Sequence, residues 1–181
     1  MGLFRKSDSE PLGVTMAGVK LGQRFLAVGT RDPKLVAALA VKAGLTGRAC
    51  VIDEDEAGLA KGAEEIEKEG ALVEPIRAPF GMWPLDAESF DVAVIPHLMP
   101  GLDAEVRARC IGEVFRVLRP GGRVIVVEPA RRAGIGALLQ RHTGDPAYKG
   151  PTEMLQSGGF TAVRILAEAD GVVYAEGIKR A

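Results

Sequence analysis

Cysteine, aromatic residues and long apolar runs are all scarce in this sequence of 181 residues. The two cysteines, Cys50 and Cys110, show no CxxC spacing and no Cys/His cluster, which argues against a zinc site and against a disulfide framework. Two buried thiols in a reducing cytosol are the simplest account, so we expect a cytoplasmic protein. No apolar run approaches the roughly 18 residues that span a bilayer, so we expect no membrane association.

The charge balance is close to neutral. The formal net charge is -1 and the isoelectric point is about 6.2. A general nucleic-acid binder normally carries a basic excess, so nucleic acid is not an expected partner. Hydrophobic residues at 47% and charged residues at 26% are ordinary values for a folded chain. We expect a flexible polar tail over residues 1–12 and a single domain over residues 13–181.

The hydrophobic pattern alternates between strands and helices along the chain. Short apolar runs predict strands at residues 24–28, 48–53, 71–77, 90–95 and 123–128. Helical spacing predicts helices at residues 33–43, 56–69 and 103–118, and a short one near 152–157. Asp32 and Asp103 are expected to cap two of these helices. The last two runs, 160–167 and 172–179, predict a β-hairpin.

This alternation predicts the fold class. Strands that alternate with helices form an α/β fold, here a doubly wound, mostly parallel sheet with helices on both faces. Ligands of such sheets bind beyond the carboxyl ends of the strands, at the switch point beside the first strand. The segments that follow the strands are therefore the places to look for a site.

Four stretches resemble a known family. Residues 113–129 (EVFRVLRPGGRVIVVEP) resemble the E-x-x-R-V-L-K-P-G-G-x-(apolar)-E-P stretch of small-molecule S-adenosylmethionine (SAM) methyltransferases. Residues 84–94 (PLDAESFDVAV) resemble their P-(F/L)-x-D-x-S-F-D segment, and residues 155–160 and 174–179 resemble their closing motifs. The chain is thus similar to class I SAM-dependent methyltransferases. That resemblance implies a Rossmann-like sheet of seven strands with a C-terminal antiparallel hairpin.

The first motif of that family, (apolar)-D-(apolar)-G-x-G-x-G, is degenerate in residues 26–33 (LAVGTRDP). Gly29 is retained, whereas Arg31 and Pro33 replace the second and third glycines and Ala27 replaces the acid. Glycine is needed where backbone approaches a ligand closely or adopts positive φ. The resemblance also implies that Asp32 adds a negative charge near the methionyl end of SAM.

Two hypotheses for this loop remain open. In the first, Arg31 swings outward or pairs with the cofactor carboxylate, and SAM still binds. In the second, Asp32 and Pro33 are a plain capped helix start, and the pocket is filled. The second hypothesis gives these residues a complete structural role without a ligand.

The resemblance implies further cofactor contacts. Asp53 ends the second strand, where the ribose-binding acid belongs, although it could equally be one of a cluster of acids at a helix start. The acid expected on the adenine side is absent at residues 78–79. Phe80 could stack on adenine or belong to the core, and His97 matches one position after the fourth strand. The candidate cofactor residues are Gly29, Thr30, Arg31, Asp53, Glu54, Pro79, Phe80 and His97.

The function implied by the resemblance is methyl transfer from SAM to a small molecule. The sulfonium is already activated, so we predict no catalytic acid or base and no metal, although His142 could act as a general base. The alternative is an inactive methyltransferase-like scaffold or partner subunit. A nicotinamide dehydrogenase is disfavoured because no G-x-G-x-x-G follows the first strand. Residues 129–150 leave little lid material, so the substrate site is open or completed by another subunit of a homo- or hetero-oligomer.

Overall fold

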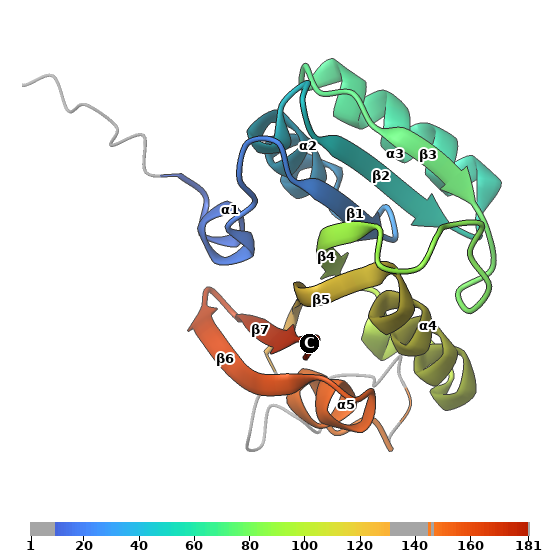
Figure 1. The fold of residues 1–181 in the computed structure, drawn as a ribbon, viewed down its shortest axis with the longest axis vertical. Coiled ribbons are helices and arrows are strands. Elements are labelled where there is room, and N and C mark those ends of the chain that lie inside the picture. Colours follow the sequence, from blue (N-terminus) through green and yellow to red (C-terminus); the bar gives the residue numbers. More distant parts are fainter. Residues whose placement is uncertain (1–9, 131–144, 146, 181) are drawn as a thin grey trace, which may run out of the picture.

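The computed structural model describes residues 10–130, 145 and 147–180. Its helices are α1 (Leu12–Ala17), α2 (Pro33–Ala43), α3 (Glu56–Lys68), α4 (Ala104–Val117) and α5 (Pro151–Ser157), with a 3-10 turn η1 (Met99–Gly101). Its strands are β1 (Arg24–Val28), β2 (Arg48–Asp53), β3 (Glu74–Arg77), β4 (Phe90–Pro96), β5 (Leu118–Pro129), β6 (Thr161–Ala169) and β7 (Val172–Ile178). These strands form one twisted sheet that runs through the molecule (Figure 1).

The strand order in the sheet is β3-β2-β1-β4-β5-β7-β6. Strands β1 to β5 pair in parallel, and β7 pairs antiparallel with both β5 and β6. The order changes direction between β1 and β4, which is the switch point where such sheets bind ligands. The predicted fold class, including the C-terminal antiparallel hairpin, is confirmed.

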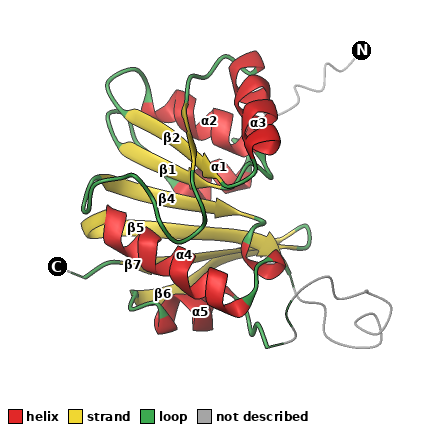
Figure 2. Ribbon diagram, turned by 90° about the vertical axis from the view of Figure 1, so that its right-hand side faces the viewer, coloured by secondary structure: helices red, strands yellow, loops and turns green. Residues whose placement is uncertain are grey.

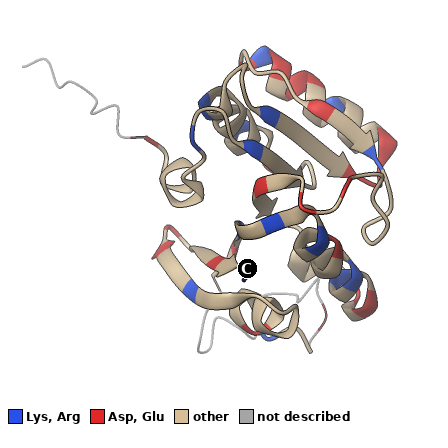
Figure 3. Ribbon diagram, in the orientation of Figure 1, with Lys and Arg blue, Asp and Glu red and all other residues tan. Residues whose placement is uncertain are grey.

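Two apolar cores lie on opposite faces of the sheet. Alternate residues of β1 divide between them, because neighbouring side chains on a strand point to opposite faces. Phe25 packs with α1, α2 and α3, whereas Leu26 packs with α4, α5 and the segment before β4. Figure 2 shows these helices on the two sides of the strands, and Figure 3 shows that acidic and basic residues are interspersed along α3 and α4.

The predicted elements agree with the structure except at some ends. Strand β3 is shorter than expected, because Ala71 donates its N–H to the Ile66 carbonyl and so completes the end of α3. Helix α4 begins where predicted, but the side chain of Asp103 makes no cap hydrogen bond. Helix α1 was not predicted. Arg123 stabilises it by donating to the carbonyl of Ala17 at 3.1 Å.

The two longest motifs of the family resemblance meet at the amino end of β4. Ser89 donates its N–H to the carbonyl of Val117 at 2.8 Å, so the S-F-D segment lies against the turn that follows α4. A Cβ atom at Gly122 would lie 2.8 Å from the carbonyl oxygen of Arg119 and 3.2 Å from that of Asp91. Glycine is therefore required there by close backbone approach. Where they meet, these motifs specify the fold, and this end of the sheet lies away from the switch point.

Both thiols should be unreactive while the protein is folded. Cys50 and Cys110 are completely buried. Burial raises the pKa of Cys50 to about 12, and it also raises the pKa of Cys110. The nucleophile is the thiolate, so neither side chain provides one near neutral pH. We expect a disulfide reagent such as DTNB to label neither cysteine at pH 8 in buffer and both in denaturant. Rapid labelling of the native protein would contradict this packing.

Candidate functional site

The loops that follow β1 and β4 border the switch point. Gly29 ends β1 with φ of +89°, a value that glycine adopts without strain, and donates its N–H to the carbonyl of Ile52 at 2.8 Å. A Cβ atom at Gly29 would lie 3.5 Å from the side chain of Leu98, which is itself buried. The backbone of Gly29 therefore lies between the ends of β2 and β4, at the centre of the candidate site.

Asp53 connects the end of β2 to the loop after β1. Its Oδ2 accepts hydrogen bonds from the backbone N–H of Thr30 at 3.1 Å and from the Thr30 hydroxyl at 3.0 Å. Its Oδ1 accepts the N–H of Asp55 at 3.1 Å, just before α3. Only 8% of Asp53 is exposed. One buried carboxylate thus orders both loops, a role that the sequence pattern did not reveal.

Thr30 is held in place by α3 as well as by Asp53. A Cβ atom at Gly62 would lie 2.8 Å from the Cβ of Thr30. Glycine inside a helix costs roughly 1 kcal/mol relative to alanine. Here it leaves the space that Thr30 occupies, so Gly62 sets how closely the loop can pack against α3.

Arg31 reaches across the switch point from the β1 loop to the β4 loop. Its Nη1 donates to the carbonyl oxygen of His97 at 3.4 Å. The guanidinium also lies 3.4 Å from the place where a Cβ atom of Gly101 would be. Arg31 is otherwise exposed to solvent. Its side chain therefore bridges the two loops that border the switch point through one long hydrogen bond.

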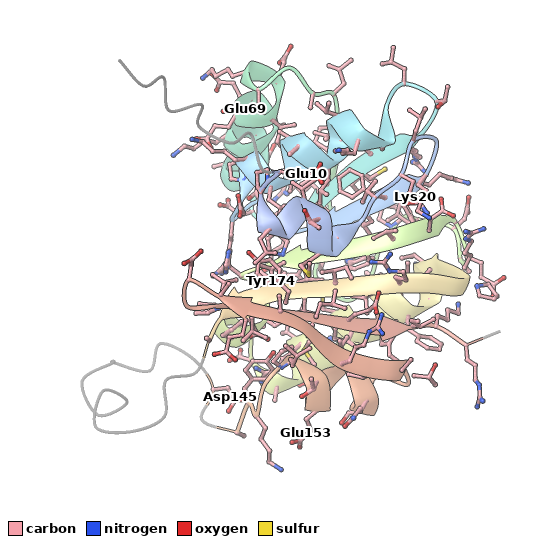
Figure 4. All side chains as sticks on the ribbon, turned by 90° about the vertical axis from the view of Figure 1, so that its left-hand side faces the viewer. Glu10, Lys20, Glu69, Asp145, Glu153 and Tyr174 are labelled. Carbon is pink, nitrogen blue, oxygen red and sulfur yellow. The ribbon has the colours of Figure 1, made fainter. Side chains whose placement is uncertain are left out.

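Asp32 and His97 make a second connection between the same loops. The Oδ1 of Asp32 accepts the N–H of Leu35 at 3.0 Å, which confirms the predicted cap of α2. Its Oδ2 faces the Nε2 of His97 at 4.0 Å. The charge of Asp32 also acts on Tyr174, which lies against α1 (Figure 4). The pKa of Tyr174 is raised, mainly because the residue is partly buried and secondly because of the negative charge of Asp32. Asp32 thus caps a helix and also leaves one oxygen facing the crevice.

A second polar cluster lies beyond the carboxyl ends of β4 and β5, and sequence reasoning missed it. Buried Arg107 donates to the carbonyl of Met99 at 3.3 Å and pairs with Asp145 at 2.5 Å. Its guanidinium stacks 4.3 Å from the ring centre of Tyr148, and the Tyr148 hydroxyl donates to Glu128 at 2.7 Å. A pocket of about 260 Å³ between α4 and α5 is lined in part by Arg107, Asp145 and Tyr148.

Comparison with known proteins identifies the family. The sequence profile described as "Methyltransferase domain" matches residues 25–122, more than half of the chain. The chain belongs to this methyltransferase family. An uncharacterized protein of Haemophilus influenzae is 32% identical over 149 residues, which are 70% of this chain and 57% of the relative. The ubiquinone/menaquinone biosynthesis C-methyltransferase UbiE of Salmonella arizonae is 28% identical over 117 residues, which are 64% of this chain and 46% of UbiE.

Solved structures share the fold of this methyltransferase domain. A SAM-dependent methyltransferase from Aquifex aeolicus aligns with a TM-score of 0.73 at 19% identity, covering 92% of this chain and 87% of that protein. PigF, solved with S-adenosylhomocysteine (SAH), aligns with a TM-score of 0.66 at 18% identity and covers 87% and 50% respectively. The methyltransferase domain described here spans about half the length of the curated relatives that it matches.

The remaining candidate residues of the methyltransferase domain lie along the β3 side of the site. Ala78 donates its N–H to the carbonyl of Asp53, which places the exposed Pro79 just beyond the end of β2. Phe80 is 4% exposed and packs in the core. Its burial therefore supports a role in the core and not stacking on adenine. Glu54 is exposed beside Asp53.

The last candidate residue is His142. His142 lies outside the residues that the structure describes. Over residues 10–130, 145 and 147–180, no group of three or more His, Cys, Asp or Glu side chains is arranged to hold a metal ion. In the same ranges, no helix combines the length and apolar character needed to cross a bilayer.

The contact between Thr30 and Asp53 should contribute measurably to stability. Hydrogen bonds to charged groups contribute about 1.5–3 kcal/mol, and Thr30→Val removes one of the two that Thr30 donates. We expect the free energy of unfolding in urea to fall by about 1–2 kcal/mol. The exposed Thr46 supplies a control, because Thr46→Val should change it by less than about 0.5 kcal/mol. Equal effects of the two substitutions would show that the contact stabilises nothing.

Proposed function

We propose that this chain transfers the methyl group of SAM to a small molecule. The observation that carries the proposal is the buried carboxylate of Asp53 beside the positive-φ backbone of Gly29, at the switch point of a methyltransferase domain. An acid at the end of the second strand is suited to ribose hydroxyls, and a glycine after the first strand admits the ligand close to the backbone.

The residues present fit a nucleoside with a charged substituent. Within the described ranges, the Oδ1 of Asp53 accepts one hydrogen bond, so this carboxylate oxygen retains a lone pair for a ribose hydroxyl. Glu54 is exposed and follows Asp53 directly in the chain, so we assign it to the same side of the sugar. Pro79 offers an uncharged surface on the β3 side for a purine ring. Arg31 and Asp32 offer both signs of charge on the β4 side.

The reaction asks for positioning more than for proton transfer. The bound cofactor supplies an electrophilic methyl group on a sulfonium, and the protein must exclude water and orient the acceptor. The cluster of Arg107, Asp145, Tyr148 and Glu128 lies at the ends of β4 and β5, so we assign the acceptor to that side. The neighbouring pocket of about 260 Å³ is somewhat smaller than a typical ligand pocket, so it leaves room only for a small acceptor.

Location and partners are extensions of the same proposal. Two buried thiols suit a reducing compartment, which supports a cytoplasmic location. The acceptor side is then completed by another subunit of a homo- or hetero-oligomer. A structural neighbour, a methyltransferase of Haloferax volcanii, was solved in complex with the Trm112 activator.

Titration with SAH tests the proposal directly. We expect binding in the micromolar range by calorimetry. We also expect a rise in melting temperature, because ligand at 100 times its Kd stabilises a protein by about 2.7 kcal/mol. NAD⁺ at the same concentration is the control and should do neither. Absence of heat and of any melting shift with SAH would reject the cofactor site and favour the inactive scaffold.

A further inference from the structure

We propose that Arg31 and Asp32 form a clamp for the amino-acid end of the cofactor, with the guanidinium on its α-carboxylate and the Asp32 carboxylate on its α-ammonium group. The inference rests on the proposed function, since it assigns the residues that recognise one end of the same ligand. It gives a role to two adjacent, oppositely charged side chains that stand at the second glycine of the family motif and at the position after it.

The order of side chains along the sheet orients the ligand. The carboxylate of Asp53 ends β2, and Pro79 lies beyond it toward β3, where the surface is uncharged. Arg31 and Asp32 lie on the opposite side, toward β4, where each faces His97. A ligand with its ribose at Asp53 and its adenine toward β3 must therefore place its zwitterionic end at Arg31 and Asp32.

The guanidinium of Arg31 is available for a stronger acceptor than the one it has. An arginine carries five N–H donors in a planar fork that matches a carboxylate with two parallel hydrogen bonds. In the described residues, Arg31 uses this fork for a single bond of 3.4 Å to the His97 carbonyl. That length is beyond the ordinary 2.7–3.2 Å of an N–H···O bond. A ligand carboxylate would thus replace the weak hydrogen bond to the His97 carbonyl with two charge-assisted hydrogen bonds to the guanidinium.

Asp32 also has one oxygen to offer. Its Oδ1 is engaged as the cap of α2, so the carboxylate is fixed in position by the helix that it begins. Its Oδ2 has the His97 ring 4.0 Å away, which is too far for a hydrogen bond. The ammonium group of the ligand could therefore donate a hydrogen bond to Oδ2, while Oδ1 continues to cap α2.

Two ligands separate the clamp from the rest of the site. SAH carries the amino-acid end, whereas 5′-methylthioadenosine has the same adenosine and thioether but lacks that end. We expect the unmodified protein to bind SAH at least about 100-fold more tightly than methylthioadenosine, because SAH makes two charge-assisted contacts that methylthioadenosine cannot make. Arg31→Ala should weaken SAH roughly 10- to 100-fold and leave methylthioadenosine unchanged, as measured by calorimetry.

Two variants control for structural effects. Asp32→Asn keeps a side chain that caps helices as well as aspartate does, so it removes the charge and retains α2. It should weaken SAH at an unchanged melting temperature of the free protein. Arg180→Ala removes an exposed arginine that follows β7 beside the amino-terminal part of β5, at the opposite edge of the sheet from the switch point, and should alter the binding of neither ligand.

The outcomes distinguish a failure of the clamp from a failure of the proposed cofactor site. If the unmodified protein binds neither ligand, the proposed function fails and the clamp fails with it. If it binds both ligands with equal affinity, or if Arg31→Ala leaves SAH unaffected, the cofactor site stands and the clamp is wrong. Tighter SAH binding by Arg31→Ala would overturn the clamp as well, because Arg31 would then be an obstruction.

Discussion

A single buried carboxylate determines the shape of the candidate site. Asp53 accepts the N–H and the hydroxyl of Thr30 on one oxygen and the N–H of Asp55 on the other. Burial strengthens these bonds, because a charged acceptor away from water cannot exchange them for solvent without a large cost. The loop after β1 and the start of α3 are thereby fixed to the end of β2, and the positions of Gly29, Arg31 and Asp32 follow.

This arrangement explains how the loop remains ordered with few glycines. In the resembling family, an acid at the position of Ala27 helps to order the loop, and in this chain Ala27 is buried against the helices. Asp53 takes over that ordering role from a neighbouring strand, with Thr30 as its partner. Helix α2 can then begin at once with Asp32 as its cap, and the residue between them, Arg31, is directed across the crevice.

The sequence predicted local features well and long-range contacts poorly. Strand β1 and the cap at Asp32 follow from apolar runs and capping chemistry that a few neighbouring residues contain. The extension of β5 back to Leu118 was not visible, because Gly121 and Gly122 interrupt the apolar pattern while their backbones still pair with Lys179. The cluster around Arg107 joins residues 38 positions apart, as in its pair with Asp145, and no local pattern encodes such a contact.

In the proposed clamp, side chains replace backbone groups in recognising the ligand, and this exchange has a physical consequence. Glycine loops present backbone N–H groups that are already ordered by the fold. Arg31 must give up roughly 2 kcal/mol of side-chain freedom when it is immobilised. Charge-assisted bonds to a carboxylate offset that loss, but charges near the surface are weakened by salt in a way that backbone donors are not. A site built on Arg31 and Asp32 therefore depends on the charge of its ligand, whereas the part built on Gly29 and Asp53 depends on its shape.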